Sequence, residues 1–463
     1  TFPTGWGVFR ESMLAWFNEK LWIKTQLLEK LKIPASKLLF VEHHLSHAAS
    51  AFFCSPFDEA AIVTVDGVGE WTTTAVGRGR ADWGNGSGGS NEIALASDIR
   101  FPHSLGLLYS AFTAFLGFEV NDGEYKVMGM APFGEPKFVD DVYKMLEVAA
   151  DGGFRLKMDY FDFHHSLIRT YSNKFLDVFG KERKHESEFF TPKTHPGRET
   201  AKATENQRYA DIAASIQTVT EEILLKIIRH AHATTGLKKL CMAGGVALNS
   251  VANGRILLEG PFEEVYIQPA AGDSGGALGA ALYAYHVLLG QPRKFVLENA
   301  YWGQGYSADE VRAFLDKQGV AYRRIEDEEK LLDEVVDTLT QGRVVGWFQG
   351  RFEWGPRALG NRSILADPTR AEMKEIVNTK IKFREPFRPF APVVLEEHSR
   401  EYFKLDNPEK HYPARYMLLV VDIPEDKQSK IPAVTHVNGT GRLQTVRRET
   451  NPWYYRVVEK FGE

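Results

Sequence analysis

Hydrophobic positions alternate between helical and strand-like spacing along most of the chain. Residues 11–31 carry apolar side chains at helical spacing, which predicts one or two amphipathic helices before Pro34. The same periodicity predicts later helices over 105–116, 211–232, 308–319 and 328–341. Short apolar runs bounded by turn residues predict strands over 37–41, 60–65, 72–76, 239–243, 264–268 and 344–348.

Glycine-rich and polar stretches separate these elements. Residues 66–71, DGVGEW, predict a tight turn between two strands, and the glycine-rich residues 80–92 predict a hairpin tip. The polar segment 181–205 is expected at the surface, and the segment 291–306 predicts a crossing between two units. Strands that run into glycine turns and then into helices predict an α/β fold, with ligands at the carboxyl ends of the strands.

Composition and charge narrow the class of protein. The chain has 463 residues, of which 43% are hydrophobic and 25% are charged, as expected for a globular protein of two or more domains. Its net charge of -5 argues against nucleic-acid binding through bulk positive charge. No apolar run has the length of a membrane span, and only two cysteines occur, Cys54 and Cys241. We therefore expect a cytoplasmic protein that binds neither nucleic acid nor membrane.

Three histidines stand within five positions in the segment VEHHLSHAAS, residues 41–50. On a helix, His43 and His47 would lie on one face because they are four positions apart, and neutral imidazole is a good ligand for iron, zinc or nickel. His44 and His47 are a competing pair, and hydrogen-bonded histidines near a helix start are the alternative to a metal site. The spacing favours a divalent metal but does not select its identity.

Asp273 is the expected third ligand. It follows a predicted strand inside the glycine-rich segment AGDSGG, residues 271–276, where the backbone can approach a ligand closely. The alternative is that Asp273 only caps the alanine-rich helix that follows. Two histidines with a carboxylate form a mixed site with open positions, suited to holding phosphate oxygens or polarising a substrate.

Two further glycine-rich turns favour a nucleotide site. One lies between two predicted strands and the other joins a strand to a helix, so backbone amides and a helix N-terminus can face a phosphate chain. Each turn alone is also compatible with a plain structural role. The residues concerned are Asp66, Gly67, Gly69, Gly244, Gly245 and Asn249.

A basic run follows in residues 349–392. A solvated helix face would interleave glutamate with lysine at helical spacing, and such a face is the alternative here. The bulky apolar and turn-forming neighbours instead suggest rigidly held guanidinium groups, which suit a phosphate or carboxylate. The basic residues are Arg351, Arg357, Arg362, Lys382, Arg384 and Arg388.

Several long blocks resemble the O-carbamoyltransferases of the nodulation and antibiotic-tailoring type. They are HHLSHAASAF, VDGVGEWTTT, FPHSLGLLYSAFTAFLGFEVNDGEYKVMGMAPFGEP, GGVALN, GDSGGALGAAL, GPRALGNRSILADP and IKFREPFRPFAP. The resemblance implies an actin/hexokinase-like domain over residues 1–300 and a smaller YrdC-like α/β domain over 301–463. It also implies two steps: carbamoyl phosphate and ATP give carbamoyl-adenylate, and the carbamoyl group then passes to a hydroxyl of a natural product or sugar.

The resemblance also assigns residues. It implies that His43, His47 and Asp273 hold a metal, most simply Fe(II), against the nucleotide phosphates, with Mg²⁺ as a further expected ion. It places the glycine-rich turns at the nucleotide. It implies a carbamoyl phosphate pocket formed by Arg357, Lys382 and Arg388, with Arg442 as a further candidate, and it places Lys126 in a shared block as a catalytic candidate. Arg384, from the same basic run, is expected to bind the ligand beside them.

Other functions remain open at this point. A tRNA-threonylcarbamoyl or hydrogenase-maturation relative is disfavoured, because zinc-finger cysteines are absent from the sequence. A kinase of the same superfold leaves the histidines unexplained, and a nucleotide-binding module without carbamoyl transfer is the non-enzymatic alternative. The chain starts at Thr1 and lacks the opening strand and closing Asn-Thr-Ser-Phe-Asn-like block of the resembled family, so we expect a piece of a longer chain. A homodimer is a further expectation, and the acceptor has no motif.

Overall fold

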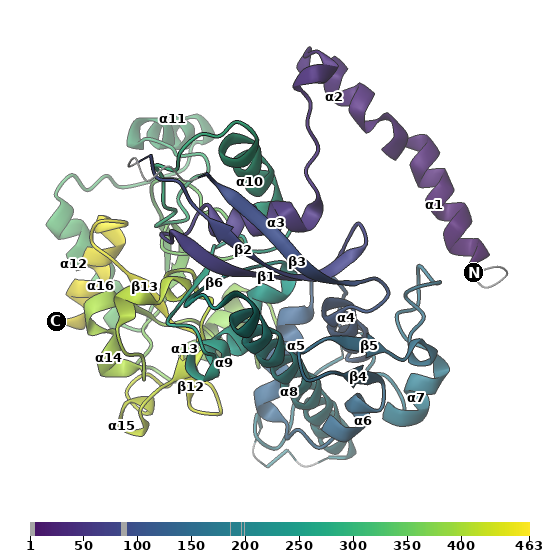
Figure 1. Ribbon diagram of the computed structural model, residues 1–463. Coiled ribbons are helices and arrows are strands. Elements are labelled where there is room, and N and C mark those ends of the chain that lie inside the picture. Colours follow the sequence, from purple (N-terminus) through teal and green to yellow (C-terminus); the bar gives the residue numbers. More distant parts are fainter. Residues whose placement is uncertain (1–4, 85–89, 186, 196, 199) are drawn as a thin grey trace.

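The structure is a computed structural model that describes residues 5–84, 90–185, 187–195, 197–198 and 200–463. Its centre is a five-stranded sheet of order β3-β2-β1-β6-β7 (Figure 1). The strands β1, β2 and β3 are antiparallel, whereas β6 and β7 run parallel to β1. This is the strand order of an actin/hexokinase-like domain, so the predicted α/β fold is confirmed. The strands are β1 Glu59–Gly69, β2 Thr72–Arg80, β3 Glu92–Arg100, β6 Lys239–Ala243 and β7 Glu264–Ile267.

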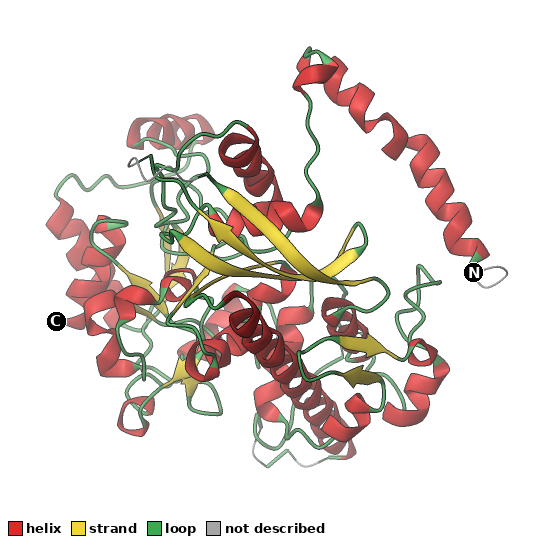
Figure 2. Cartoon of the chain, in the orientation of Figure 1, coloured by secondary structure: helices red, strands yellow, loops and turns green. Residues whose placement is uncertain are grey.

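Helices cover both faces of this sheet, which explains why β1 is buried without interruption from Ala60 to Asp66. Figure 1 shows α3 and α10 on one side and α4 and α8 on the other, and Figure 2 shows the same layering by element type. A strand that is buried on both faces reads as a continuous apolar run rather than an alternating one. The helices are α3 His43–Phe52, α4 Leu105–Phe115, α8 Ala201–Thr235, α9 Ser250–Glu259 and α10 Ser274–Tyr283.

A smaller helical region with one hairpin follows α4. Its packing is dominated by phenylalanines, of which Phe112, Phe115, Phe175 and Phe179 contact one another through their rings. The elements are α5 Glu124–Met130, the 3-10 turn Ala131–Phe133, α6 Val139–Tyr143, β4 Leu146–Val148, β5 Phe154–Leu156 and α7 Asn173–Phe179.

The second unit is also α/β, with its strands in three separate pairs. The chain reaches it through residues 289–306, where the predicted crossing lies, and the division at residue 300 stays a prediction. The pairs are β8 Val345–Phe348 with β9 Arg362–Leu365, β10 Val393–Leu395 with β13 Gln444–Val446, and β11 Val421–Asp422 with β12 Thr440–Gly441. The helices are α11 Ala308–Gln318, α12 Glu328–Thr340, α13 Met373–Glu375, α14 Ser399–Tyr402, α15 Glu425–Gln428 and α16 Pro452–Gly462.

The N-terminal helices extend away from the body of the molecule (Figure 1). They are α1 Trp6–Asn18 and α2 Ile23–Leu31, and neither contains a buried residue. The predicted strand over 37–41 is wrong: a 3-10 turn, Ala35–Lys37, is followed by extended chain. Leu39 and Phe40 are exposed there, because the segment pairs with no strand of the described sheet.

Two other predictions shift at their boundaries. Helix α8 begins at Ala201, inside the segment expected to be a polar surface excursion, and is therefore longer than predicted. The strands β2 and β3 pair antiparallel around the glycine-rich segment, although its residues 85–89 lie outside the described part of the chain. None of the described helices combines the length and apolarity needed to cross a lipid bilayer.

Candidate metal and anion sites

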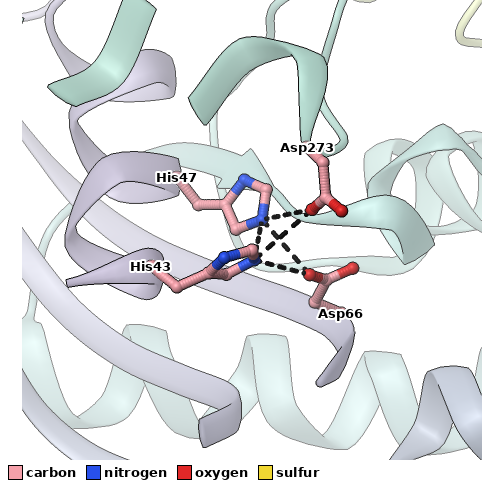
Figure 3. A group of neighbouring side chains, drawn as sticks. All are labelled: His43, His47, Asp66 and Asp273. Atoms are coloured by element: carbon pink, nitrogen blue, oxygen red, sulfur yellow. Dashed lines mark hydrogen bonds and ion pairs between the residues drawn. The ribbon is translucent and has the colours of Figure 1, made fainter. Parts of the chain in front are cut away.

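Four side chains from different elements converge at the carboxyl end of β1 (Figure 3). His43 Nε2 lies 2.9 Å from Asp66 Oδ2 and 3.4 Å from Asp273 Oδ1. His47 Nε2 lies 3.3 Å and 3.5 Å from the same two oxygens. The two Nε2 atoms are 2.9 Å apart, and all four ligand atoms lie within 4.8 Å of one another. We call these four residues the His/Asp cluster.

Small residues let the elements of the His/Asp cluster approach one another. A Cβ atom on Gly69 would lie 2.1 Å from Cδ2 of His43, so only glycine leaves room for that ring. A Cβ atom on Gly279 of α10 would lie 1.8 Å from the carbonyl oxygen of Ser46 on α3. The glycines of GDSGGALGAAL therefore bring α10, with Asp273 at its start, against the helix that carries the histidines.

Asp273 is turned toward the histidines rather than toward its own helix. It occupies the N-cap position of α10, but its side chain makes no capping hydrogen bond. Its carboxylate is 78% exposed, so one face of the His/Asp cluster is open to solvent and to a ligand. The capping alternative considered from the sequence is therefore not what the structure shows.

Asp66 joins the His/Asp cluster to the second glycine-rich turn. Its Oδ1 atom accepts a hydrogen bond of 2.9 Å from the backbone N–H of Gly245, which leaves Oδ2 facing the histidines. The sequence placed Asp66 in a phosphate-binding turn but did not identify it as a candidate metal ligand. Its position at the end of a central strand, where α/β folds place ligands, was the signal that could have found it.

Opposite charges inside the His/Asp cluster hold His47 and Asp66 in their ionised forms. Burial by itself would lower the pKa of His47, but hydrogen bonds with Asp273 and Asp66 outweigh it and raise the pKa to about 9. Burial also opposes ionisation of Asp66, yet hydrogen bonds from His43 and His47 hold its pKa well below the usual range. A bound cation would replace the proton that these groups share.

His44 is separate from the His/Asp cluster. Its Nδ1 atom lies 2.7 Å from the hydroxyl of Thr64, and its Nε2 atom donates to the carbonyl oxygen of Thr72 at 2.9 Å. Burial and the charge of His47 lower its pKa to about 4, so it is neutral near pH 7. His44 therefore ties α3 to strands β1 and β2, and the competing His44 and His47 pair is not formed.

The donor set fits a divalent transition metal. Two imidazole nitrogens and two carboxylate oxygens match the mixed preference of Fe(II) or Zn(II), whereas Mg²⁺ prefers oxygen ligands throughout. The Nδ1 atom of His47 is buried and has no hydrogen-bond partner among the described residues. Both histidines present Nε2 to the same point, as ligands to one ion do (Figure 3).

The predicted nucleotide turns lie beside the His/Asp cluster because β1 and β6 are parallel neighbours. Gly244 has a φ of 94°, and a Cβ atom there would lie 2.2 Å from the carbonyl oxygen of Val65. The carbonyl oxygen of Gly67 accepts a hydrogen bond from the Ser104 hydroxyl at 2.5 Å. The Asn249 side chain caps α9 through the N–H of Ala252, at 3.1 Å.

A cavity of about 440 Å³ lies between the two units, lined by residues of α5, α8, α9, α13 and β12. One wall comes from the first unit and includes Gln217 and Glu221, and the opposite wall is basic. We call this cavity the basic pocket and define it by five side chains of the second unit. They are Lys374, Arg384, Arg388, His436 and Arg442.

The cations of the basic pocket largely lack counter-charges. Burial and the charges of neighbouring arginines lower the pKa of Arg384 and of Arg442 to about 10. Burial lowers the pKa of Lys374 as well. Among the described residues, neither Arg442 nor Lys374 makes an ion pair. Unpaired cations are costly to bury, so this arrangement suits an anion.

The carboxylate of Glu385 lies at one edge of the basic pocket. It forms an ion pair of 2.9 Å with Lys126 and one of 3.3 Å with Arg388, whose guanidinium also lies 4.6 Å from the centre of the Tyr125 ring. Lys126 therefore contacts the pocket through Glu385 and links α5 of the first unit to the second unit.

The other predicted basic residues divide between the vicinity of the pocket and structural positions. Arg357 donates to the carbonyl oxygen of Leu248 at 3.1 Å, and burial together with the charge of Arg442 lowers its pKa to about 9. The pKa of Lys382 is lowered by burial and then by Arg384, Arg388 and Arg442, which places it near the same charges. Arg351 and Arg362 instead donate to backbone carbonyls outside the pocket. Lys374 and His436 were missed from the sequence, since neither stands in a recognisable motif.

Comparison with protein families decides the class of this chain. The family described as carbamoyltransferase N-terminus matches residues 3–282, and that described as carbamoyltransferase C-terminus matches residues 336–463. The chain belongs to the carbamoyltransferase family. Members of this family are transferases, so the predicted enzyme class is confirmed.

Individual relatives support the family assignment along nearly the whole chain. An uncharacterized protein of Synechocystis sp. is 46% identical over 99% of this chain and 75% of its own length. Nodulation protein NolNO of Sinorhizobium fredii is 37% identical over 93% of this chain and 58% of its own length. Nodulation protein NolO of Bradyrhizobium diazoefficiens is 36% identical over 91% of this chain and 70% of its own length. The chain thus corresponds to part of these carbamoyltransferase relatives.

Proposed function

We propose that this carbamoyltransferase chain belongs to an ATP-dependent O-carbamoyltransferase. It converts carbamoyl phosphate and ATP to carbamoyl-adenylate at the basic pocket and then transfers the carbamoyl group to a hydroxyl of a natural product or sugar. The observation that carries the proposal is a pocket in which Lys374, Arg384 and Arg442 make no ion pair with the described residues, in a member of a carbamoyltransferase family. Because protein groups do not balance those charges, an anionic substrate can balance them.

The basic pocket suits the first step because that step gathers negative charge. Carbamoyl phosphate first loses inorganic phosphate to water, which leaves carbamate. A carbamate oxygen then attacks the α-phosphate of ATP while pyrophosphate leaves, so fixed cations help more than a covalent nucleophile. Arg388 and Arg442 are assigned to the phosphate groups, with Lys382 and Arg384 beside them. Arg357, held at Leu248 in the nucleotide turn, connects the pocket to the nucleotide.

The His/Asp cluster is assigned to the transfer step. His43, His47, Asp66 and Asp273 would hold a divalent metal, for which we propose Fe(II), and the metal would supply positive charge against the nucleotide phosphates. Asp66 positions the turn at Gly245 through its second carboxylate oxygen. The exposed side of Asp273 leaves an approach for the adenylate and the acceptor hydroxyl.

The products of ATP test the first step. With carbamoyl phosphate present, the protein should convert ATP to AMP and pyrophosphate, as measured by chromatography of the nucleotides. Formation of ADP would contradict the proposal and indicate a kinase. Separate calorimetric titrations with ATP and with carbamoyl phosphate add a second test, because a simple nucleotide-binding module should bind only the first.

The two-site division has its own test. His47→Ala should abolish carbamoyl transfer to an acceptor but leave carbamoyl-adenylate formation measurable, because His47 belongs to the His/Asp cluster rather than to the basic pocket. Equal loss of both activities would argue against separate sites. The partly exposed His230→Ala is a matched control, since it removes a histidine of α8 that is not part of the His/Asp cluster.

A further inference from the structure

The segment 436–442 forms a tight turn that presents several polar side chains to the basic pocket. The backbone N–H of His436 donates to the carbonyl oxygen of Thr440 at 2.8 Å, and the N–H of Gly439 donates to the carbonyl oxygen of His436 at 2.9 Å. His436, Asn438, Thr440 and Arg442 all line the cavity. The turn therefore holds the His436 ring beside the cations of the pocket.

Hydrogen bonding within this turn fixes the tautomer of His436. The hydroxyl of Thr440 donates to Oδ1 of Asn438 at 2.8 Å. A threonine hydroxyl has one hydrogen, so Thr440 can only accept in its 3.1 Å contact with Nδ1 of His436. Nδ1 therefore carries the proton of the neutral ring, and Nε2 is left with a lone pair.

The Nε2 atom of His436 is buried and has no hydrogen-bond partner among the described residues. Burial, then the charges of Arg442 and Lys374, lower the pKa of His436 to about 3, so the ring is neutral near pH 7. A buried acceptor without a hydrogen-bond partner is unfavourable in the empty pocket. It becomes favourable when a ligand brings an N–H group to it.

The buried side-chain acceptors of Gln217 and Glu221 on the cavity wall are already engaged, and the exposed Asp422 carboxylate pairs with Lys404 at 3.7 Å. Oε1 of Gln217 receives hydrogen bonds from Tyr109 and Asn249, and the two Glu221 oxygens receive them from Gln217 and Arg255. Oδ1 of Asn438 receives the Thr440 hydroxyl. His436 Nε2 is thus a buried acceptor without a partner, and it lies beside cations that can act only as donors.

We propose that His436 determines specificity for the carbamoyl group, by accepting a hydrogen bond at Nε2 from the NH₂ group of carbamoyl phosphate. The inference rests on the proposed function and names the part of the substrate that this residue contacts. The phosphate oxygens are acceptors and belong with the arginines, whereas the carbamoyl NH₂ is a donor and needs the opposite partner. Acetyl phosphate has a methyl group in place of that NH₂ and serves as the discriminating analogue.

The test compares three ligands by isothermal titration: carbamoyl phosphate, acetyl phosphate and inorganic phosphate. The wild-type protein should bind carbamoyl phosphate roughly tenfold more tightly than acetyl phosphate, since one buried hydrogen bond separates them. His436→Phe should remove this preference while leaving the affinity for inorganic phosphate unchanged. His436→Gln, which keeps an acceptor at a similar distance from the backbone, should retain part of it.

Each other result has a defined meaning. If His436→Phe weakens all three ligands equally, His436 contacts the phosphate and the inference is overturned. If the variant keeps the wild-type preference, the inference is also overturned, but the proposed function stands because carbamoyl phosphate still binds. If the wild-type protein does not bind carbamoyl phosphate, both fail together.

Two further variants separate recognition from folding. Thr440→Val removes the hydroxyl that accepts from Nδ1, so it should reduce the preference by a smaller factor than His436→Phe. His411→Gln is the matched control: it changes another histidine of the second unit whose pKa is lowered by burial and which does not line the cavity. It should keep the full preference. Thermal melting of every variant confirms that the fold is retained.

Discussion

The His/Asp cluster contains its own counter-charges, whereas three cations of the basic pocket, Lys374, Arg384 and Arg442, make no ion pair with the described residues. In the cluster, burial would lower the pKa of His47, but two carboxylates outweigh it and raise the pKa to about 9. In the pocket, burial and then the charges of Arg442 and Lys374 lower the pKa of His436 to about 3. The charges of the His/Asp cluster thus balance one another within the protein, whereas the charges of the basic pocket need a ligand to balance them. We therefore expect the His/Asp cluster to bind a cation and the basic pocket to bind an anion.

The largest expected effect comes from removing a carboxylate of the cluster. Asp66→Asn should weaken Fe(II) or Zn(II) binding by about 100-fold or more, because it removes a buried anionic ligand. Asp273→Asn should cost about tenfold, since that side chain is 78% exposed and water can replace it. Anaerobic metal titration measures both. The exposed Asp177→Asn is the control, and equal losses for Asp66 and Asp273 would contradict the difference in burial.

Removing a cation from the pocket should produce two changes of opposite sign. Arg442→Met should weaken binding of pyrophosphate by about tenfold, since a charge-assisted hydrogen bond is lost. Without anion, the same variant should be more stable than the wild type by about 1 kcal/mol, because an unpaired buried cation is gone. Calorimetry and thermal melting test these two effects. Arg229→Met, at an exposed position, should change neither, and a destabilised Arg442 variant would show that the guanidinium supports the fold.

The sequence was most informative where the chemistry is local. The spacing of His43 and His47 on one helix, and the apolar run of β1, depend on neighbours a few positions away, so both were predicted. The strand expected over 37–41 failed because a strand also needs a partner, which local propensity does not supply.

Contacts between distant segments were what the sequence could not reveal. Asp66 accepts a hydrogen bond from the backbone N–H of Gly245, which lies 179 positions away in the sequence. This bond orients the Asp66 carboxylate toward the histidines. Lys374 and His436 enter the basic pocket from separate segments with no shared motif. The family resemblance supplied the identity of the two regions, but the difference in their charge balance follows only from the three-dimensional contacts.

A smaller effect concerns the pH dependence of stability. The pKa of His436 is about 3 in the folded protein and 6.5 when unperturbed, so the unfolded chain binds the proton more readily. Stability that is present above pH 6.5 is therefore lost as the pH falls, by about 1.6 kcal/mol between pH 6.5 and 5. Urea denaturation at each pH should show a shallower loss for His436→Gln than for the wild type. Parallel curves would contradict the lowered pKa.

The smallest expected effect comes from removing the negative charge of Glu385, which makes the charge balance of the basic pocket differ further from that of the His/Asp cluster. Glu385 pairs with Arg388 at 3.3 Å and with Lys126 at 2.9 Å, so it competes with an anion for both cations. Glu385→Gln should strengthen pyrophosphate binding about two- to threefold, because the pair is partly exposed and solvent screens much of its charge. Titration against the exposed control Glu425→Gln measures the change. Weaker binding in Glu385→Gln would instead mean that Glu385 orients Arg388 for the anion, and the unpaired cations of the pocket would then not be sufficient to bind it.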